Sequence, residues 1–264
     1  MRTALTIAGS DSGAGAGIQA DLKTFAAHGV YGTSAITAVT AQNTRGVVAW
    51  EAISPALVVA QIEAVISDLG ADAVKTGMLA NAGIVMAVCS VLRAFNPGSL
   101  VVDPVMVAKG GDRLLEEPAI AAIRRELLPL CRVVTPNIPE AEVLSGLSIS
   151  SLDAMREAGR RILALGPRVV LVKGGHLGGP ESIDIACTAA GFVEFRSPRL
   201  ETVHTHGTGC TLASAIAANL ALGHEDEEAI RRAKSYVDGA LRHAPGLGSG
   251  HGPLEHFWEL GAGS

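Results

Sequence analysis

Short apolar runs alternate with amphipathic helical patterns along most of this chain, and no other feature limits its fold as much. Each run is bounded by glycine or polar residues, which is typical of a buried strand. Strands that are linked by crossover helices form a mainly parallel sheet that is covered on both faces. The pattern predicts an α/β fold with strands at residues 3–8, 34–41, 47–53, 73–75, 100–102, 132–134 and 169–172.

Capping residues mark the starts of several helices between these strands. Ser54 precedes a proline and an apolar stripe, and Asn81 precedes another such stripe. Asn137 and Glu140 have the spacing of a capping box, in which each side chain accepts a hydrogen bond from the backbone of the other residue. We also expect a helix over residues 116–128, a helix that Ser150 opens, a hairpin over 182–188 and 192–195, and a last helix around 229–241.

The stretch from His204 to Thr211 reads HTHGTGCT and leads into an apolar helix that ends at Gly223. A helix that is apolar all round is buried. Two glycines directly before it leave several backbone N–H groups, and the positive end of the helix dipole, pointing at one spot. Such an arrangement binds an anion, most simply a phosphate. The structural alternative is a tight turn before a core helix, because a short glycine-rich turn is a weak signal by itself.

Polar residues that follow strands are candidates for one common site, because ligands of parallel sheets bind beyond the carboxyl ends of the strands. One such segment is the glycine-rich loop of residues 9–17. It lacks the further signatures of a dinucleotide fold or a P-loop, but its backbone can be approached closely by another molecule. Eight residues are expected to converge at this edge of the sheet: Asp11, Gln42, Met78, Asp103, Asn137, Glu140, Lys173 and Cys210.

Two carboxylates and a lysine in this set indicate phosphoryl transfer. Asp103 and Glu140 offer the oxygen ligands that Mg²⁺ prefers, with water and substrate phosphate completing its shell. Lys173 can neutralise a nucleotide phosphate, and positioning and charge neutralisation carry most of such catalysis. The structural alternatives are a capping box alone for Glu140, a turn before Pro104 for Asp103, and a solvated strand end for Lys173.

Cys210 stands at the mouth of the apolar helix. A free cysteine is usually an inert buried residue, and this is the structural alternative here. At a helix N-terminus, however, the pKa of a thiol falls from about 8.5 toward neutrality. A thiolate in that position can accept a proton from a substrate hydroxyl group. We therefore expect the pKa of Cys210 to be lowered.

Composition and charge argue against several classes of function. The net charge is -5 at pH 7, whereas nucleic-acid binding needs a basic face, so no nucleic-acid partner is expected. No apolar run is long enough to span a bilayer, and the first residues lack a signal-peptide pattern, so we expect no membrane partner. The four cysteines form no CxxC pair, which favours free thiols in a reducing cytoplasm over disulfides or a zinc site.

Several linked motifs resemble those of the hydroxymethylpyrimidine/phosphomethylpyrimidine kinases of thiamine biosynthesis. The turn from Gly207 to Cys210 resembles the GTGD turn of ribokinase-like kinases, with cysteine in place of the aspartate. The other motifs are GSDSGAGAGIQADLK at 9–23, AQNTRGV at 41–47, KTGML at 75–79, DPVM at 103–106, TPNIPE at 135–140 and KGGH at 173–176. The resemblance covers nearly the whole chain. It implies a single ribokinase-like domain over residues 1–264, a three-layer α/β/α sandwich around a mainly parallel central sheet.

The family resemblance also implies an activity. This is the phosphorylation of 4-amino-5-hydroxymethyl-2-methylpyrimidine on its hydroxymethyl group with ATP and Mg²⁺, followed by phosphorylation of the monophosphate to the diphosphate. A small-molecule substrate, a cytoplasmic location and a homodimer are implied as well. In this interpretation the amide of Gln42 pairs with the edge of the aminopyrimidine, since it carries both a donor and an acceptor.

The remaining site residues take their roles from the same resemblance. Gly207, Thr208 and Gly209 hold the transferring phosphoryl group, and Cys210 faces the hydroxyl. Met78 and Val105 line the binding site of the ring, and Asp21 lies nearby. Asp103 and Glu140 hold the metal, and Lys173 and Lys234 contact the nucleotide, although Lys234 has the alternative of extending to water from an apolar helix stripe.

Other activities remain open at this point. A pyridoxal kinase of the same superfamily is the main alternative, and a sugar kinase fits less well because Met78 and Val105 give few polar contacts. A non-catalytic sensor that binds the pyrimidine or the nucleotide is an alternative of another class. The chain departs from the family at residues 13–14, where Ser-Gly is usual, and at 109–112, where a serine or threonine commonly precedes the second glycine.

Overall fold

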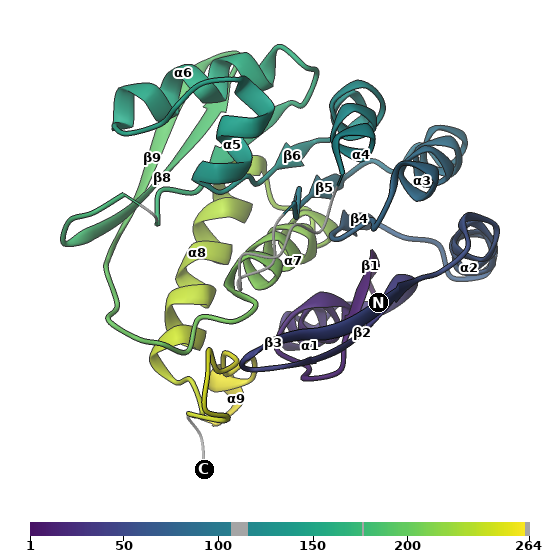
Figure 1. Cartoon of the computed structure of the whole chain (residues 1–264), viewed down its shortest axis with the longest axis horizontal. Helices are drawn as coiled ribbons and strands as arrows, with labels where there is room; N and C mark the ends of the chain where they lie inside the picture. Colours follow the sequence, from purple (N-terminus) through teal and green to yellow (C-terminus); the bar gives the residue numbers. More distant parts are fainter. Residues whose placement is uncertain (107–115, 176, 262–264) are drawn as a thin grey trace.

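A computed structural model describes residues 1–106, 116–175 and 177–261 of the chain. Within these residues nine strands form one sheet in the order β3-β2-β1-β4-β5-β6-β7-β8-β9 (Figure 1). The strands are β1 Thr3–Asp11, β2 Tyr31–Asn43, β3 Gly46–Ala52, β4 Ala73–Thr76, β5 Leu100–Val102, β6 Val133–Val134, β7 Val169–Val172, β8 Glu181–Thr188 and β9 Gly191–Pro198.

The central strands of this sheet are parallel, as the alternation of strands and helices predicts. β2, β1, β4, β5, β6 and β7 pair in parallel. The edges are antiparallel: β3 pairs with β2 at one side, and the predicted hairpin of β8 and β9 adds to β7 at the other. The expected mainly parallel sheet is therefore confirmed.

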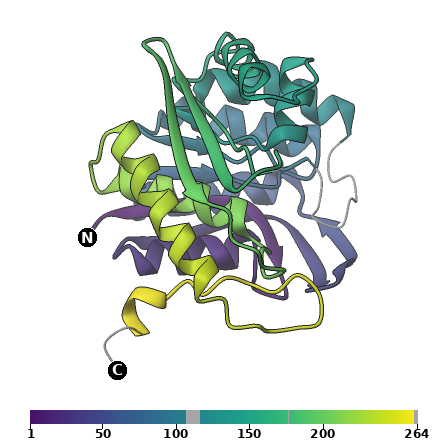
Figure 2. The same cartoon turned by 90° about the vertical axis from the view of Figure 1, so that its left-hand side faces the viewer.

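Helices cover both faces of the sheet (Figures 1 and 2). One layer packs residues of α2 to α6 against the strands, and the other packs α1, α7 and α8. This is the expected three-layer α/β/α arrangement. The helices are α1 Gly17–Ala27, α2 Pro55–Asp68, α3 Ala82–Phe95, α4 Glu117–Ala122, α5 Ile138–Ser145, α6 Leu152–Leu163, α7 Thr208–Ala221, α8 Asp226–Arg242 and α9 Trp258–Gly261.

Burial on both faces explains why the central strands read as continuous apolar runs. Val101 and Val133 belong to the core beneath α7, whereas their neighbours Val102 and Val134 belong to the core beneath the opposite layer. Successive side chains of a strand point to opposite faces, so each residue meets a helix layer. None of the helices in the described part of the chain is long and apolar enough to cross a membrane.

The capping predictions are largely confirmed. The side chains of Ser54 and Asn81 accept hydrogen bonds from the backbone at the starts of α2 and α3, and Asn137 and Glu140 form a capping box at the start of α5. The predicted start of α6 is wrong by one residue, because Ser151 and not Ser150 caps it. Serine is a good cap at either position, and in the structure the side chain of Ser151 accepts the hydrogen bond from the backbone of Ala154.

The helix expected over residues 116–128 is only partly correct. The structure has α4 over Glu117–Ala122, then a π-helical turn over Ile123–Leu127 and a 3₁₀ turn over Leu128–Leu130. Pro129 has no N–H to continue the α-helical hydrogen bonds, so the helix changes type before it. The apolar spacing of this segment did not reveal the change.

The contact between α6 and β8 can be tested at Gly159. A Cβ atom at this position would lie 2.1 Å from the sulfur of Cys187. We expect Gly159→Ala to lower the free energy of unfolding by about 1–3 kcal/mol, because overpacking outweighs the gain of about 1 kcal/mol from the helix propensity of alanine. Urea denaturation measures the change.

A double-mutant cycle provides the control for this prediction. Cys187→Ala removes the opposing sulfur atom, so Gly159→Ala in that background should cost much less than in the unmodified chain. Equal costs in the two backgrounds would contradict close packing of α6 on β8.

Candidate active site

A cavity of about 710 Å³ opens at the carboxyl edge of the sheet. Its wall is formed by the ends of the parallel strands, the loop after β1 and the start of α7. The expected convergence is confirmed, since this one cavity is lined by all eight residues proposed for the edge: Asp11, Gln42, Met78, Asp103, Asn137, Glu140, Lys173 and Cys210. Val105, Gly207, Thr208, Gly209 and Lys234 line it as well.

The start of α7 presents backbone N–H groups to this cavity. Within the described residues, no backbone carbonyl accepts a hydrogen bond from the N–H of Gly209 or Cys210. Gly207 before them has a φ of 82°, and a Cβ atom there would lie 1.8 Å from the backbone oxygen of Gly15, so only glycine fits. The two free N–H groups and the helix dipole favour an anion at this position.

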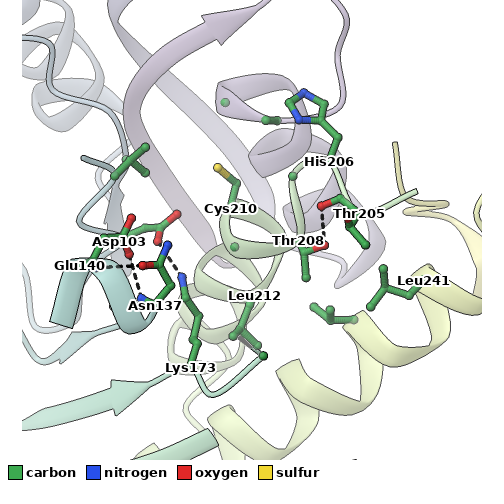
Figure 3. A pocket seen from close by; sticks show the side chains of 18 of the residues that line it. Asp103, Asn137, Glu140, Lys173, Thr205, His206, Thr208, Cys210, Leu212 and Leu241 are labelled. Atoms are coloured by element: carbon green, nitrogen blue, oxygen red, sulfur yellow. Dashed lines mark hydrogen bonds and ion pairs between the residues drawn. The ribbon is translucent and has the colours of Figure 1, made fainter. Parts of the chain in front are cut away.

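Lys173 and Asp103 face the same turn. A Cβ atom added to Gly209 would lie 3.2 Å from Nζ of Lys173 and 3.8 Å from Oδ2 of Asp103. Lys173 contacts Oδ1 of Asp103 at 3.3 Å. Figure 3 shows these side chains, with Glu140 and Asn137, gathered on one side of Cys210, while His206 and Thr208 lie on the other.

Glu140 combines a structural role with a place in the cavity. Its Oε2 accepts a hydrogen bond from the backbone of Asn137 at 2.8 Å, which completes the capping box. Burial raises the pKa of Glu140 to about 7; the charge of Lys173 opposes this shift and that of Asp103 adds to it. The structural alternative and the functional prediction for Glu140 are therefore compatible.

The chemistry of Asp103 and Glu140 fits a magnesium ion. Both carboxylates are buried beside one cavity, where the charge of Asp103 raises the pKa of Glu140, and a bound cation would remove that penalty. In the part of the chain that the structure describes, no group of three or more His, Cys, Asp or Glu side chains could hold a metal. Water and substrate phosphate would thus supply the other oxygen ligands, as is usual for Mg²⁺.

The expected low pKa of Cys210 is wrong. Burial raises the pKa of this thiol to about 12, and the negative charges of Asp103 and Asp21 add to the shift, although Lys75 and a hydrogen bond with the Gly17 backbone oppose it. The helix N-terminus is too weak to overcome this desolvation. Cys210 is therefore a neutral thiol at pH 7. Its thiolate, which is the form that can accept a proton, needs a nearby positive charge to stabilise it.

Gln42 and His206 meet at the opposite wall. Nε2 of Gln42 lies 3.3 Å from Nε2 of His206, and Oε1 lies 3.2 Å from Oγ1 of Thr40. His206 in turn lies 2.8 Å from Oδ2 of Asp11. Since Asp11 can only accept, Nε2 of His206 donates to it, and the hydrogen bond from Oγ1 of Thr40 is what holds the amide of Gln42 at the cavity wall. No role was assigned to His206 from the sequence, although its place directly before Gly207 in the HTHGTGCT stretch was a usable signal.

Asp11 also orders the glycine-rich loop after β1. Its carboxylate accepts hydrogen bonds from the backbone of Gly13 at 2.8 Å, Gly15 at 3.1 Å and Ala16 at 2.8 Å. Burial alone would raise the pKa of Asp11, but His206 and these N–H groups hold it below its usual range. Ala14, at the first departure from the family, has a φ of 58°. The second departure, at 109–112, lies outside the described residues.

Asp21, which the resemblance places near the ring as a substrate-binding residue, does not line the cavity. Its side chain is fully buried and is not among the residues that line the wall. Instead both of its carboxylate oxygens accept hydrogen bonds from Nζ of Lys75, which does line the cavity. The sequence predicted that Asp21 lies on a helix, but not that its side chain is fully buried. Lys75 is a cavity residue that sequence reasoning missed, although it opens the KTGML motif.

Lys234 lies in the cavity wall and is held there by an acid. Its Nζ contacts Oδ2 of Asp184 at 2.7 Å, and both side chains are mostly buried. Oδ1 of Asp184 accepts a hydrogen bond from the backbone of Gly174. Extension of Lys234 to open water, the structural alternative, is therefore not observed. Asp184 was also missed, because nothing in the β8 pattern marks it as a cavity residue.

The chain matches known kinases over almost its whole length. A family model of phosphomethylpyrimidine kinase matches residues 11–255. A hydroxymethylpyrimidine/phosphomethylpyrimidine kinase of Rhizobium meliloti is 52% identical, over 96% of this chain and 96% of that protein. A thiamine biosynthesis bifunctional protein of Geobacter sulfurreducens is 54% identical over 96% of this chain, which spans only 52% of that longer relative.

Solved structures show the same likeness. The crystal structure of a phosphomethylpyrimidine kinase from Clostridium difficile has a TM-score of 0.81 and 47% identity, covering 90% of this chain and 98% of that one. An ADP complex of Bacillus subtilis pyridoxal kinase has a TM-score of 0.91 and 36% identity, covering 98% and 99%. This chain is thus a kinase with the ribokinase-like α/β fold, and it belongs to the phosphomethylpyrimidine kinase family.

Proposed function

We propose that this chain transfers the γ-phosphoryl group of ATP to the hydroxymethyl group of 4-amino-5-hydroxymethyl-2-methylpyrimidine, and then phosphorylates the monophosphate to the diphosphate in thiamine biosynthesis. The observation that carries the proposal is one cavity that joins the free N–H groups of Gly209 and Cys210, the thiol of Cys210 and the amide of Gln42. The names of the relatives support the choice of substrate.

In the first transfer the hydroxyl oxygen of the substrate attacks the γ-phosphorus of ATP. The bond from that phosphorus to the bridging oxygen breaks, and ADP leaves. The N–H groups of Gly209 and Cys210 stabilise the charge on the transferring oxygens. The hydroxyl proton passes to the thiolate form of Cys210, which faces the cavity.

The second transfer differs in its proton balance. The attacking group is then a phosphate oxygen of the monophosphate, which carries no proton above its second pKa of about 6. No base is needed for this attack. The same N–H groups serve both transfers, whereas Cys210 as a proton acceptor serves only the first.

The charged residues of the cavity suit the nucleotide. Asp103 and Glu140 would hold Mg²⁺, which would neutralise charge on the phosphate chain. Lys173 and Lys234 are mostly buried in the wall and supply positive charge for the phosphates. Met78 and Val105 supply an apolar wall for the flat ring.

Pyridoxal phosphorylation is the second candidate, favoured by the likeness to the B. subtilis pyridoxal kinase. The amide of Gln42 supports the aminopyrimidine, since a ring with an amino group beside a ring nitrogen offers a donor and an acceptor together. A phosphate-transfer assay with Mg-ATP should compare hydroxymethylpyrimidine, its monophosphate, pyridoxal and ribose. We expect the highest kcat/KM with the two pyrimidines; a preference for pyridoxal would contradict the proposal.

A cytoplasmic location is part of the proposal. Its support is that all four cysteines, Cys89, Cys131, Cys187 and Cys210, are free, as is usual in a reducing compartment. The homodimer that the resemblance implies stays a prediction.

The two transfers should respond differently to Cys210→Ala. With hydroxymethylpyrimidine we expect kcat to fall about 10²–10⁴-fold, because the proton acceptor is lost. With the monophosphate, at about pH 8, kcat should fall less than about tenfold, because that substrate has no proton to lose. Steady-state kinetics with each substrate measure the difference, and KM should change little in either case.

Cysteine replacement elsewhere is the control for this prediction. Cys89→Ala changes a buried cysteine of α3 that does not line the cavity, so it should leave both transfers within about twofold. In the unmodified chain the first transfer should also accelerate from about pH 7 to about pH 9, since the thiolate fraction rises as the pH approaches the raised pKa of Cys210. If Cys210→Ala lowers kcat equally with both substrates, Cys210 does not accept the proton.

Gln42→Leu tests where the ring binds. We expect KM for hydroxymethylpyrimidine to rise about 10- to 100-fold, because the polar edge of the ring loses its partner in a largely buried site. KM for ATP should stay within about twofold. Gln61→Leu makes the same chemical change on α2, outside the cavity, and should alter neither constant. An unchanged KM for Gln42→Leu would mean that the ring lies elsewhere.

A further inference from the structure

A fully buried ion pair lies under the cavity. Lys75 on β4 and Asp21 on α1 are both inaccessible to solvent, and Nζ of Lys75 lies 2.9 Å and 2.8 Å from the two carboxylate oxygens. The free energy needed to remove two charges from water is often larger than the attraction between them, so a buried ion pair usually adds little stability. A buried pair at the floor of a reaction site therefore requires an explanation beyond stability.

The carboxylate of Asp21 is held rigidly by three elements. Besides Lys75 it accepts hydrogen bonds from Oγ1 of Thr6 on β1 and Oγ of Ser214 on α7, each at 2.6 Å. Each of its oxygens thus has two donors. The position of the ammonium group is in turn fixed, because Asp21 contacts it with both oxygens.

The ammonium group of Lys75 lies directly behind the cavity wall. Lys75 lines the cavity although it is closed to solvent, and a Cβ atom at the neighbouring wall residue Gly77 would lie 2.9 Å from its Nζ. Among the described residues only Asp21 accepts a hydrogen bond from this group, which has three protons. Two of its three protons are therefore directed at Asp21, and the group stays protonated at the cavity floor.

Helix geometry places Cys210 next to this pair. Ser214, which touches Asp21, follows Cys210 by four residues in α7, so the two side chains lie on the same helix face one turn apart. The charges around Cys210 come from four elements: Lys75 on β4, Asp21 on α1, Asp103 after β5 and Lys173 after β7. Lys75 is the strongest of the influences that favour a charged sulfur there.

We propose that Lys75, oriented by Asp21, is a positioning residue for the first phosphoryl transfer: its fixed positive charge favours the proton-accepting form of Cys210. This role rests on the proposed kinase reaction. When the hydroxyl proton moves to the sulfur, the substrate oxygen forms its bond to phosphorus, and Lys75 keeps its own proton throughout. Its charge is little screened, because no water reaches it.

The test uses the intact chain with the pair made neutral. Lys75→Gln/Asp21→Asn removes both charges and strands neither, and the new amides can still bond to each other and to Thr6 and Ser214. Lys75→Arg keeps the positive charge, and the planar guanidinium group can donate two hydrogen bonds to the carboxylate of Asp21. Arg132→Gln/Asp226→Asn is the control, because it removes a 2.6 Å ion pair that does not line the cavity; Arg168, the other partner of Asp226, is exposed to water.

The first measurement needs no substrate. Iodoacetamide alkylation at about pH 8 reports on Cys210, since the other three cysteines are buried. We expect the rate to fall at least about tenfold in Lys75→Gln/Asp21→Asn, and to stay within about threefold in Lys75→Arg and within about twofold in the control pair. Circular dichroism verifies that each variant is folded.

The second measurement is kinetic. With hydroxymethylpyrimidine, kcat of Lys75→Gln/Asp21→Asn should fall about 100-fold while KM changes less than about threefold, and Lys75→Arg should restore most of kcat. Unchanged alkylation in the neutral pair, or equal losses in the arginine and neutral variants, would overturn the role of Lys75. If the unmodified chain does not phosphorylate the pyrimidine, the proposed function is wrong. The alkylation rates would still show whether the charge of Lys75 makes Cys210 more reactive.

Discussion

The free N–H groups at the start of α7 are the constraint on which the rest of the site depends. They face the cavity because Gly207 turns the chain with a φ that other residues rarely adopt, and because the backbone of Gly15 approaches it too closely for a side chain. The apolar body of α7 buries this helix against the sheet, so its first turn cannot move away. An anion binding there would meet donors that are already in place.

Three lysine–aspartate pairs surround those donors in the described part of the chain: Lys75–Asp21, Lys173–Asp103 and Lys234–Asp184. Each pair keeps a buried lysine compensated while no phosphate is present. Only the first pair is closed to solvent, and the lysines of the other two remain partly accessible. Burial thus separates Lys75, which is fully enclosed with its aspartate, from Lys173 and Lys234, which the cavity can still reach.

Periodicity and position in the chain predicted most of the fold and the set of residues at the sheet edge. Central strands that are buried on both faces leave a continuous apolar run, so β5 and β7 were placed correctly. The depth of polar side chains was not predictable. Asp21 is drawn inward by Thr6 and Ser214, which are distant in sequence, and the pKa of Cys210 depends on a burial that no local pattern records. The contact of His206 with Gln42 likewise forms only in the folded chain.

A crystal structure with ADP, Mg²⁺, aluminium fluoride and hydroxymethylpyrimidine would show whether the start of α7 holds the transferring group. We expect the aluminium fluoride group, which stands in for the transferring phosphoryl group, to accept hydrogen bonds from the N–H groups of Gly209 and Cys210. The pyrimidine should lie beside it, with the amide of Gln42 on its polar edge. A fluoride group bound away from the start of α7, or a ring that does not touch Gln42, would contradict this placement of the phosphoryl group and the substrate.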